Sequence, residues 1–267
     1  MNIKKWGALV AAGALAASLA LFGCSSGDQG TTTSSTSGND AGYTLVNDGK
    51  LTVAASLDFP PFENLNGDKP EGFAVDLMTL LAEEMGLECE YLPSTKFDTI
   101  VPLIQTGGKA DVGVSGITIT DERLDQVDFT DAVCDVNQSI TVRSDSGITD
   151  VAQLEGKKIG AQSGTTGYEW AAENIKDAEV TGYDEMTAVF AALDSGQIDA
   201  VSVDLPVANY YVRSYSDCQV IKEIPTGEQY AVAVSKENPE LTKALNKALQ
   251  AVHDNGKYDE LAAKWLQ

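Results

Sequence analysis

From Lys50 to Asp204 the sequence alternates between short runs of strand-forming residues and longer segments whose apolar residues recur at helical spacing. Strands are expected at 50–56, 88–92, 111–115, 158–161, 200–203 and near Val180, and helices at 73–85, 97–104, 185–193 and from about Thr166. A repeated strand–helix order favours an α/β fold with largely parallel sheets covered by helices, and such sheets bind ligands at the carboxyl ends of their strands. The region from Pro239 to Leu266 is expected to be helical and amphipathic.

The chain is strongly acidic, with 18 Lys+Arg against 40 Asp+Glu and a formal net charge of −22 over 267 residues. Nucleic-acid binding needs clustered cations, so nucleic acid is not an expected partner. The single histidine, His253, excludes a His-rich metal site and gives little support to nucleophilic catalysis. No two cysteines form the C-x-x-C pair that is typical of structural zinc. The sequence therefore predicts no cofactor and no metal.

The N-terminus has the pattern of a targeting segment. Lys4 and Lys5 precede an apolar run from Trp6 to Phe22 that contains no acidic residue. A charged start followed by a short apolar core is typical of a secretory signal peptide, here over residues 1–23. An uncleaved anchor helix is the alternative, and both interpretations place the rest of the chain outside the cytoplasmic membrane.

The apolar run ends in Leu21-Phe22-Gly23-Cys24, which resembles the bacterial lipobox, although Phe22 is bulkier than usual at its position. The resemblance implies cleavage before Cys24 and lipid attachment to that cysteine. Residues 24–42 are mostly Gly, Ser and Thr and have no apolar period, so they are expected to form a flexible linker between the lipid and the folded part.

Five stretches of the folded part resemble those of one protein family. They are Phe59-Pro60-Pro61-Phe62; Gly72-Phe73-Ala74-Val75-Asp76-Leu77; Ser115-Gly116-Ile117-Thr118-Ile119-Thr120-Asp121-Glu122-Arg123 with Val127-Asp128-Phe129-Thr130; Gln162-Ser163-Gly164-Thr165-Thr166-Gly167; and Asp199-Ala200-Val201-Ser202-Val203-Asp204. The third stretch is the most specific, and all five occur in the family's order. From about Lys50 to its C-terminus the chain resembles the extracytoplasmic amino-acid-binding proteins that feed ABC-type importers, the bacterial solute-binding proteins of family 3.

The resemblance implies a two-lobed type II periplasmic-binding-protein-like fold, in which two crossover strands join two α/β lobes around a cleft. The crossovers are expected near 136–141 and 228–232. Lobe 1 is accordingly expected to comprise residues 43–137 and 231–267, and lobe 2 to comprise residues 138–230.

A free amino acid carries a carboxylate and an ammonium on one carbon, and burying either without a partner is costly. Arg123 offers a planar fork suited to the carboxylate, and a turn can bring the N–H and hydroxyl of Thr118 to the same anion. Thr166 would begin a helix, whose free N–H groups favour anions. Asp204 follows a buried-looking strand and can receive the ammonium with help from the Gly116 carbonyl. Matching positions in the family have these roles.

Ordinary structural roles compete with each assignment. Arg123 could be a solvated helix residue, and Asp204, Thr165 and Thr166 could be only helix N-caps. Phe59 and Phe97 could belong to the core. The resemblance favours the cleft for all of them and implies a ligand site made of Ser56, Phe59, Phe97, Ser115, Gly116, Thr118, Arg123, Gln162, Thr165, Thr166, Val203 and Asp204.

The side-chain pocket of this site is expected to prefer an uncharged polar ligand. The resemblance places Ser56 where relatives that bind cationic amino acids often carry an acidic residue, with Gln162 and Val203 on the far side. A glutamine-like side chain therefore fits best, while Glu63 or Asp58 is left open as an alternative partner for a cationic one.

The expected function is that of a monomeric, lipid-anchored receptor, which captures a free amino acid and delivers it to the permease of an ABC transporter. Gly164-Thr165-Thr166-Gly167 lacks the Gly-Lys-Ser/Thr of a nucleotide-binding loop, so ATP should bind another chain. A cyclohexadienyl-dehydratase-like enzyme on the same scaffold is the alternative, with Glu63 or Asp58 as acid or base. A disulfide between Cys134 and Cys218 is left open.

Overall fold

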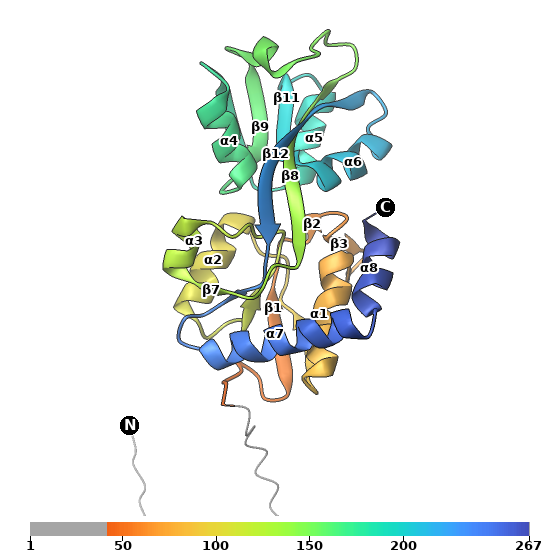
Figure 1. Ribbon diagram of the computed structural model, residues 1–267. Helices are drawn as coiled ribbons and strands as arrows, with labels where there is room; N and C mark the ends of the chain where they lie inside the picture. Colours follow the sequence, from red (N-terminus) through yellow and green to blue (C-terminus); the bar gives the residue numbers. More distant parts are fainter. Residues whose placement is uncertain (1–41, 267) are drawn as a thin grey trace, which may run out of the picture. The chain divides into compact units, whose positions relative to one another are not determined.

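The computed structural model describes residues 42–266, which form two α/β lobes connected by two long strands (Figure 1). The sheet of lobe 1 has five strands, in the spatial order β5 (Glu88–Tyr91), β1 (Lys50–Ala54), β6 (Val112–Gly113), β13 (Ala233–Val234) and β7 (Asp128–Phe129). Its helices are α1 (Phe73–Glu84), α2 (Phe97–Thr106), α3 (Asp121–Gln126), α7 (Pro239–Asp254) and α8 (Lys257–Trp265). A small antiparallel sheet is made of β2 (Asp58–Phe59), β3 (Glu63–Asn66) and β4 (Lys69–Glu71).

Lobe 2 contains a second five-stranded sheet. Its strands are, in spatial order, β10 (Glu179–Tyr183), β9 (Lys158–Gln162), β11 (Ala200–Asp204), β8 (Cys134–Arg143) and β12 (Cys218–Tyr230). Its helices are α4 (Thr166–Asn174), α5 (Met186–Asp194), α6 (Leu205–Ser214) and the short 3-10 helix η1 (Val151–Leu154). The expected α/β class and the two-lobed arrangement are confirmed.

The strands β8 and β12 join the two lobes (Figure 1). They pair antiparallel over most of their length, from Cys134 opposite Tyr230 to Cys218 opposite Arg143. The first crossover strand spans the region where the family resemblance implies it, whereas β12 begins well before residue 228. The pairing is interrupted between Ile224 and Glu228, where Pro225 cannot donate to the ladder and Gly227 has a φ of 65°.

The expected strands and helices are present with small differences at their ends. The prediction of largely parallel sheets is only half right, because β13, β8 and β12 run antiparallel to their neighbours as the chain returns between the lobes. The predicted lobe boundaries at 137/138 and 230/231 fall within β8 and at the end of β12, so they stay a prediction.

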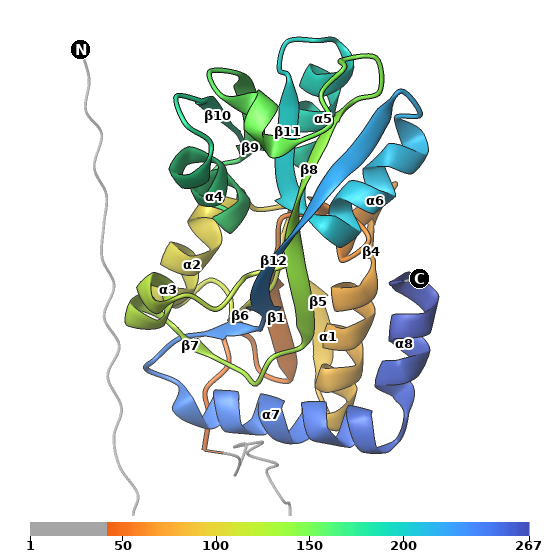
Figure 2. The ribbon, with the colours of Figure 1, turned by 45° about the horizontal axis from the view of Figure 1, so that its top comes forward.

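Helix α1 illustrates how local sequence positions an element. Gly72 precedes it with a φ of 135°, and a Cβ at this position would lie 2.2 Å from the carbonyl oxygen of Phe62. Only glycine therefore lets the chain enter the helix against the 59–62 segment. Helix α8 lies alongside α1 (Figures 1 and 2), where the Trp265 Nε1 donates to Asp76 Oδ2 at 2.8 Å.

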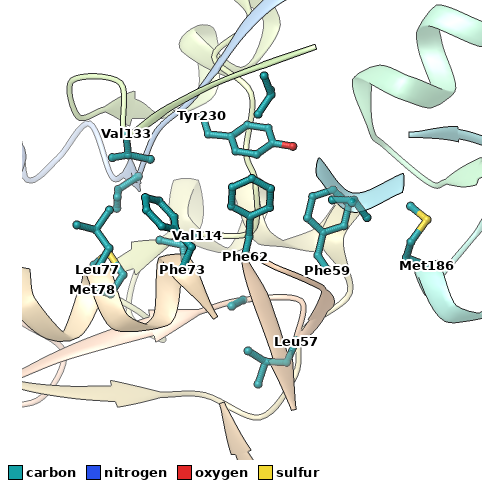
Figure 3. Close-up of a cluster of buried hydrophobic side chains, with 14 of the residues drawn as sticks. Leu57, Phe59, Phe62, Phe73, Leu77, Met78, Val114, Val133, Met186 and Tyr230 are labelled. Atoms are coloured by element: carbon teal, nitrogen blue, oxygen red, sulfur yellow. The ribbon is translucent and has the colours of Figure 1, made fainter. Parts of the chain in front are cut away.

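Aromatic side chains form the part of the core next to the crossover strands (Figure 3). The ring of Phe62 packs edge-on against Tyr230, with centroids 5.1 Å apart, and lies 6.3 Å from Phe59. Figure 3 shows Met186 of lobe 2 on the other side of Phe59, and both belong to one buried apolar cluster. The base of the lobe junction is therefore apolar and packed.

The disulfide left open for Cys134 and Cys218 is not formed. Both are free thiols, as is Cys89. The two cysteines begin β8 and β12 respectively, and antiparallel pairing places the starts of the two strands at opposite ends of the ladder.

Several predictions concern residues that the structure does not describe. The signal peptide over 1–23, the lipidated Cys24 and all of the 24–42 linker but Gly42 lie outside the described residues. Within 42–266, no helix is both long enough and apolar enough to span a membrane.

Candidate functional site

Arg123 connects the two lobes. It lies in the first turn of α3, where its N–H donates to the Thr120 hydroxyl at 3.2 Å. Its Nη1 donates to the Thr118 carbonyl at 2.7 Å, and its Nη2 donates to the Gly164 carbonyl of lobe 2 at 2.9 Å. The guanidinium carbon lies 5.5 Å from the ring centroid of Phe97. Arg123 is therefore not a solvated helix residue, and its five N–H groups are not exhausted by these two bonds.

Burial lowers the pKa of Arg123, and the carboxylates of Glu169, Glu228 and Asp204 oppose that shift. The guanidinium stays charged throughout, because its pKa begins far above neutrality. The site therefore has a fixed positive charge among several acids.

Asp204 is the buried acid of lobe 2. It ends β11, is only 5% exposed and accepts a hydrogen bond from Gln138 Nε2 at 3.0 Å. Gln138 lies directly opposite it in the β8–β11 register. Burial raises the pKa of Asp204 to about 7, and the charge of Glu228 adds to that effect while the Tyr230 hydroxyl lowers it. A cation beside this carboxyl would favour its ionised form.

The N-cap alternatives have different outcomes for Asp204 and Thr165. Asp204 occupies the position before α6, but its side chain makes no capping hydrogen bond there. Thr165 does cap α4, since its hydroxyl oxygen accepts from the Tyr168 N–H at 3.2 Å, and it donates to the Gln162 carbonyl at 2.7 Å. The Thr165 side chain is thus a helix N-cap, and Thr166 is the first residue of α4.

A carboxylate that the sequence does not single out lies between the two threonines of the site. Glu228 Oε2, on β12, accepts from the Thr166 hydroxyl at 2.6 Å and from the Thr118 hydroxyl at 2.9 Å. Gln138 Nε2 lies 3.4 Å from the same oxygen, which links Glu228 to Asp204. Thr118, Thr166 and Asp204 are therefore joined in one hydrogen-bond network.

Ser56, Ser115 and Gly116 form the lobe 1 wall. The Ser56 N–H donates to Ser115 Oγ at 3.1 Å, and Ser115 Oγ donates to the Ser56 carbonyl at 3.2 Å. Gly116 has a φ of 55°, and a Cβ there would lie 2.8 Å from Phe59 Cε1. Glycine at 116 thus lets the backbone approach the Phe59 and Tyr230 rings closely.

Gln162 faces this wall from lobe 2. Its Nε2 donates to the Asp184 carbonyl at 3.1 Å and lies 3.5 Å from Ser56 Oγ. Its Oε1 is buried and accepts no hydrogen bond among the described residues. Buried acceptors are normally satisfied, so this oxygen can receive a donor from a ligand.

The apolar members of the predicted site are all buried. Phe59, Phe97 and Val203 are 3%, 8% and 2% exposed. Phe59 packs among core aromatics (Figure 3) and Phe97 lies under Arg123. The core and cleft interpretations of the two rings are thus not exclusive, since each ring is buried and contacts a predicted site residue.

Further polar contacts join the two lobes near Ser56. Asp58 of lobe 1 accepts from the Thr187 N–H at 3.0 Å and from the Tyr211 hydroxyl at 3.2 Å. Lys96 and Asp184 form an ion pair between the lobes. Burial raises the pKa of Asp58, and the hydrogen bonds from Thr187 and Tyr211 oppose the shift.

A cavity of about 280 Å³ lies at the outer edge of the junction. It is lined by Phe97, Arg123 and Gly164 of the predicted region, together with Glu122 and Glu169, but it does not reach Asp204. In the part of the chain that the structure describes, no three His, Cys, Asp or Glu side chains converge as metal ligands would.

Sequence reasoning missed Gln138 and Glu228. Both lie on crossover strands, and Gln138 is fully buried. Both strands contain several other polar residues, so no local signal singles out these two. The pairing of β8 with β11 and β12, which sets where the side chains meet, is not readable from the sequence.

Known proteins resemble this chain over nearly all of its described residues. Residues 51–267 match the bacterial extracellular solute-binding proteins, family 3. The chain belongs to this family. It is 31% identical to the arginine-binding extracellular protein ArtP of Bacillus subtilis (strain 168), over 99% of this chain and 98% of that protein.

Two solved structures of similar proteins superpose well on this chain. One is an ancestral arginine-binding protein bound to glutamine, which is 36% identical, has a TM-score of 0.75 and covers 82% of this chain and 98% of its own. The other is the ancestral amino-acid-binding protein AncCDT-1, a precursor of cyclohexadienyl dehydratase, with 35% identity, a TM-score of 0.76 and coverage of 82% and 96%. The similar proteins are thus amino-acid-binding proteins, with one neighbour ancestral to an enzyme.

Proposed function

We propose that this chain is a monomeric receptor that captures a free amino acid between its lobes and presents the closed form to the permease of an ABC transporter. The observation that carries the proposal is the pair of opposite charges at the lobe junction, Arg123 from lobe 1 and the buried Asp204 from lobe 2. A zwitterion matches both charges at once, so binding it favours closure. Ser56, Phe59, Ser115, Gly116, Gln162 and Val203 would surround the rest of the ligand.

The ligand side chain we propose is uncharged, polar and able to donate an N–H, as in glutamine. The buried Gln162 Oε1 lacks a partner among the described residues and suits an amide donor. Asp58, the acid nearest in sequence to Ser56, already accepts hydrogen bonds from Thr187 and Tyr211. A similar ancestral arginine-binding protein is solved bound to glutamine as well as to arginine, so a site of this kind can hold an amide side chain.

A cationic side chain such as arginine's is the second candidate. Glu63 is fully buried and both of its carboxylate oxygens lack a hydrogen-bond partner within 42–266. Burial raises the pKa of Glu63 well above its usual range, and the neighbouring Gly116 N–H opposes that shift. A guanidinium reaching Glu63 would satisfy these oxygens and restore their charge.

The proposal includes anchoring outside the cytoplasmic membrane. Cleavage after residue 23 and lipid on Cys24 would tether the lobes through the 24–42 linker. The extracytoplasmic character of the family supports this location. The lobes would be residues 43–137 with 231–267, and 138–230.

The proposal is tested by a thermal-shift screen of the mature protein against the common amino acids, because a ligand that binds only the native form raises the melting temperature. Calorimetry with glutamine, citrulline and arginine then separates the candidates, since citrulline has the shape of arginine without its charge. An absence of any shift would overturn amino-acid capture. Turnover of prephenate-like substrates would instead support the dehydratase-like alternative, which the likeness to AncCDT-1 makes worth measuring.

A further inference from the structure

Among the residues that the structure describes, Glu228 is the acid that accepts from the hydroxyls of Thr118 and Thr166, two residues of the predicted ligand site. It follows the irregular Pro225–Gly227 segment of β12, where the pairing register with β8 shifts. A single oxygen, Oε2, accepts from Thr166 Oγ1 at 2.6 Å and from Thr118 Oγ1 at 2.9 Å. The two threonines belong to different lobes, so the carboxylate on the crossover strand meets both halves of the site.

These bonds change what each threonine can offer to a ligand. A hydroxyl has one hydrogen, so while Thr118 and Thr166 donate to Glu228 they cannot donate to a second acceptor. The donors that the two threonines can still offer to a ligand are therefore their main-chain N–H groups. Thr166 is the first residue of α4, where the N–H groups have no intrahelical partner.

The Thr118 N–H is directed by the strand pairing around it. The Ile119 N–H donates to the Gln229 carbonyl at 2.9 Å, and the Ala231 N–H donates to the Ile117 carbonyl at 3.1 Å. The peptide groups on either side thus pair with the 229–231 segment, and the N–H and carbonyl of Thr118 point the opposite way. That carbonyl accepts from Arg123, so the Thr118 N–H lies on the side of the guanidinium.

We propose that Glu228 is a positioning residue of the amino-acid site: it holds Thr118 and Thr166 from opposite lobes, so that their N–H groups converge with Arg123 on the ligand carboxylate. The inference rests on the proposed function. It gives the Thr118 hydroxyl a different role from the one that the sequence suggests.

The charge of Glu228 also acts on the other pole of the site. Gln138 donates to both Glu228 and Asp204, and the groups that face Asp204 are Glu228 and Tyr230 from β12 and Arg123 from α3. The Glu228 charge raises the pKa of Asp204. Removing it should move the pH dependence of ammonium binding to lower pH, which a purely structural role would not do.

The test compares E228A and E228Q with E223A in the mature protein. Glu223 is an exposed acid on the same strand whose Oε1 accepts from Asn137 Nδ2 at 2.8 Å, so E223A removes the same charge without touching the site. Calorimetry uses L-glutamine and L-arginine in parallel. E228A should weaken binding about tenfold or more, because hydrogen bonds to a charged group are lost, while E223A should bind like wild type. E228Q keeps an acceptor oxygen and should recover part of the loss.

The same titrations at several pH values should give E228Q a lower pH midpoint than wild type. Equal affinities for E228A and E223A, both folded, would overturn the proposal, and so would tighter binding by E228A, which would make Glu228 a competitor of the ligand.

If E228A does not fold, T166V provides a second test, because it removes the hydroxyl that donates to Glu228, and T166S restores that hydroxyl. Equal binding by T166V and T166S would also overturn the proposal. Wild type that binds neither amino acid would instead indicate failure of the proposed function.

Discussion

Arg123 donates to a carbonyl of its own lobe, that of Thr118, and to a carbonyl of lobe 2, that of Gly164, and it has further N–H groups for a ligand. R123A should weaken amino-acid binding by at least about a hundredfold, because about two charge-assisted hydrogen bonds are lost. R123K keeps the charge but loses the fork, and should recover only part of the affinity. Isothermal titration calorimetry measures both.

Lys109 provides a control for this prediction. It is exposed in the turn before β6, and K109A removes one positive charge from lobe 1 away from the site. R123A that binds as tightly as K109A would remove Arg123 from the ligand site.

The pKa of Asp204, raised to about 7 by burial and by Glu228, predicts a pH-dependent affinity. An ammonium beside Asp204 favours the ionised carboxyl, so the bound state has the lower pKa. Binding below neutrality must then release a proton, and affinity should fall by up to about tenfold per pH unit below about pH 7, and be flat just above it. Calorimetry in buffers of different ionisation enthalpy counts the released proton.

D204N is the reference for this pH dependence. The asparagine cannot titrate, so the variant should bind weakly and with little change in affinity between about pH 5.5 and 8. A wild-type affinity that is equally insensitive to pH would show that the ligand ammonium lies elsewhere.

Among the elements, α5 depends on the other lobe for its cap. Glu185 precedes this helix without a side-chain capping bond, and Asp58 of lobe 1 accepts from the N–H and the hydroxyl of Thr187 instead, at 3.0 and 3.2 Å. Losing an N-cap costs about 0.5–2 kcal/mol. Because Asp58 caps α5 only while the lobes are in contact, its loss destabilises the closed form and not the open form. D58A should therefore weaken ligand binding about three- to thirtyfold through the cost of closure.

The matched control is D194N at the other end of α5, which removes an exposed acid that does not face lobe 1. D194N should bind like wild type in the same calorimetric titration. If D58A and D194N bind equally, the Asp58 contact does not contribute to closure.

The helices and strands also differ in how well the sequence predicts them. Apolar spacing predicted α1 and α2 within a few residues, because an amphipathic helix must repeat its buried face every turn, and the strand–helix alternation predicted α5 and the start of α4. The paired strands β8 and β12 were placed only through the family resemblance, because their length and register depend on partners distant in the chain.

The candidate site divides in the same way. Arg123, Thr118 and Asp204 lie within motifs that are local in sequence, so they could be named in advance. The contacts of Gln138 and Glu228 follow from the register of three strands and from the break after Ile224, and no local pattern encodes them. Thr165 was predicted as a ligand-binding residue, and its hydroxyl is used to cap α4.

At the scale of the whole molecule, the two lobes are joined by the crossover strands, by apolar packing such as that of Phe59 beside Met186, and by a few polar bonds. Arg123 with Gly164, Asp58 with Thr187 and Lys96 with Asp184 each have one partner in either lobe. Such polar bonds exchange readily with water, so they add only modestly to the stability of the contact between the lobes. A ligand that adds bonds to both lobes shifts this balance.

Small-angle scattering therefore should record a larger radius of gyration for the ligand-free protein than for the liganded protein, and the liganded curve should match scattering calculated from residues 42–266 with the linker added. R123A, at a concentration of amino acid that saturates wild type, should keep the larger radius, because the carboxylate no longer connects lobe 1 to α4. K109A should compact like wild type. A wild-type radius that stays constant while calorimetry reports saturation would mean that the lobes do not respond to the ligand, and a permease would then need another feature to distinguish loaded from empty protein.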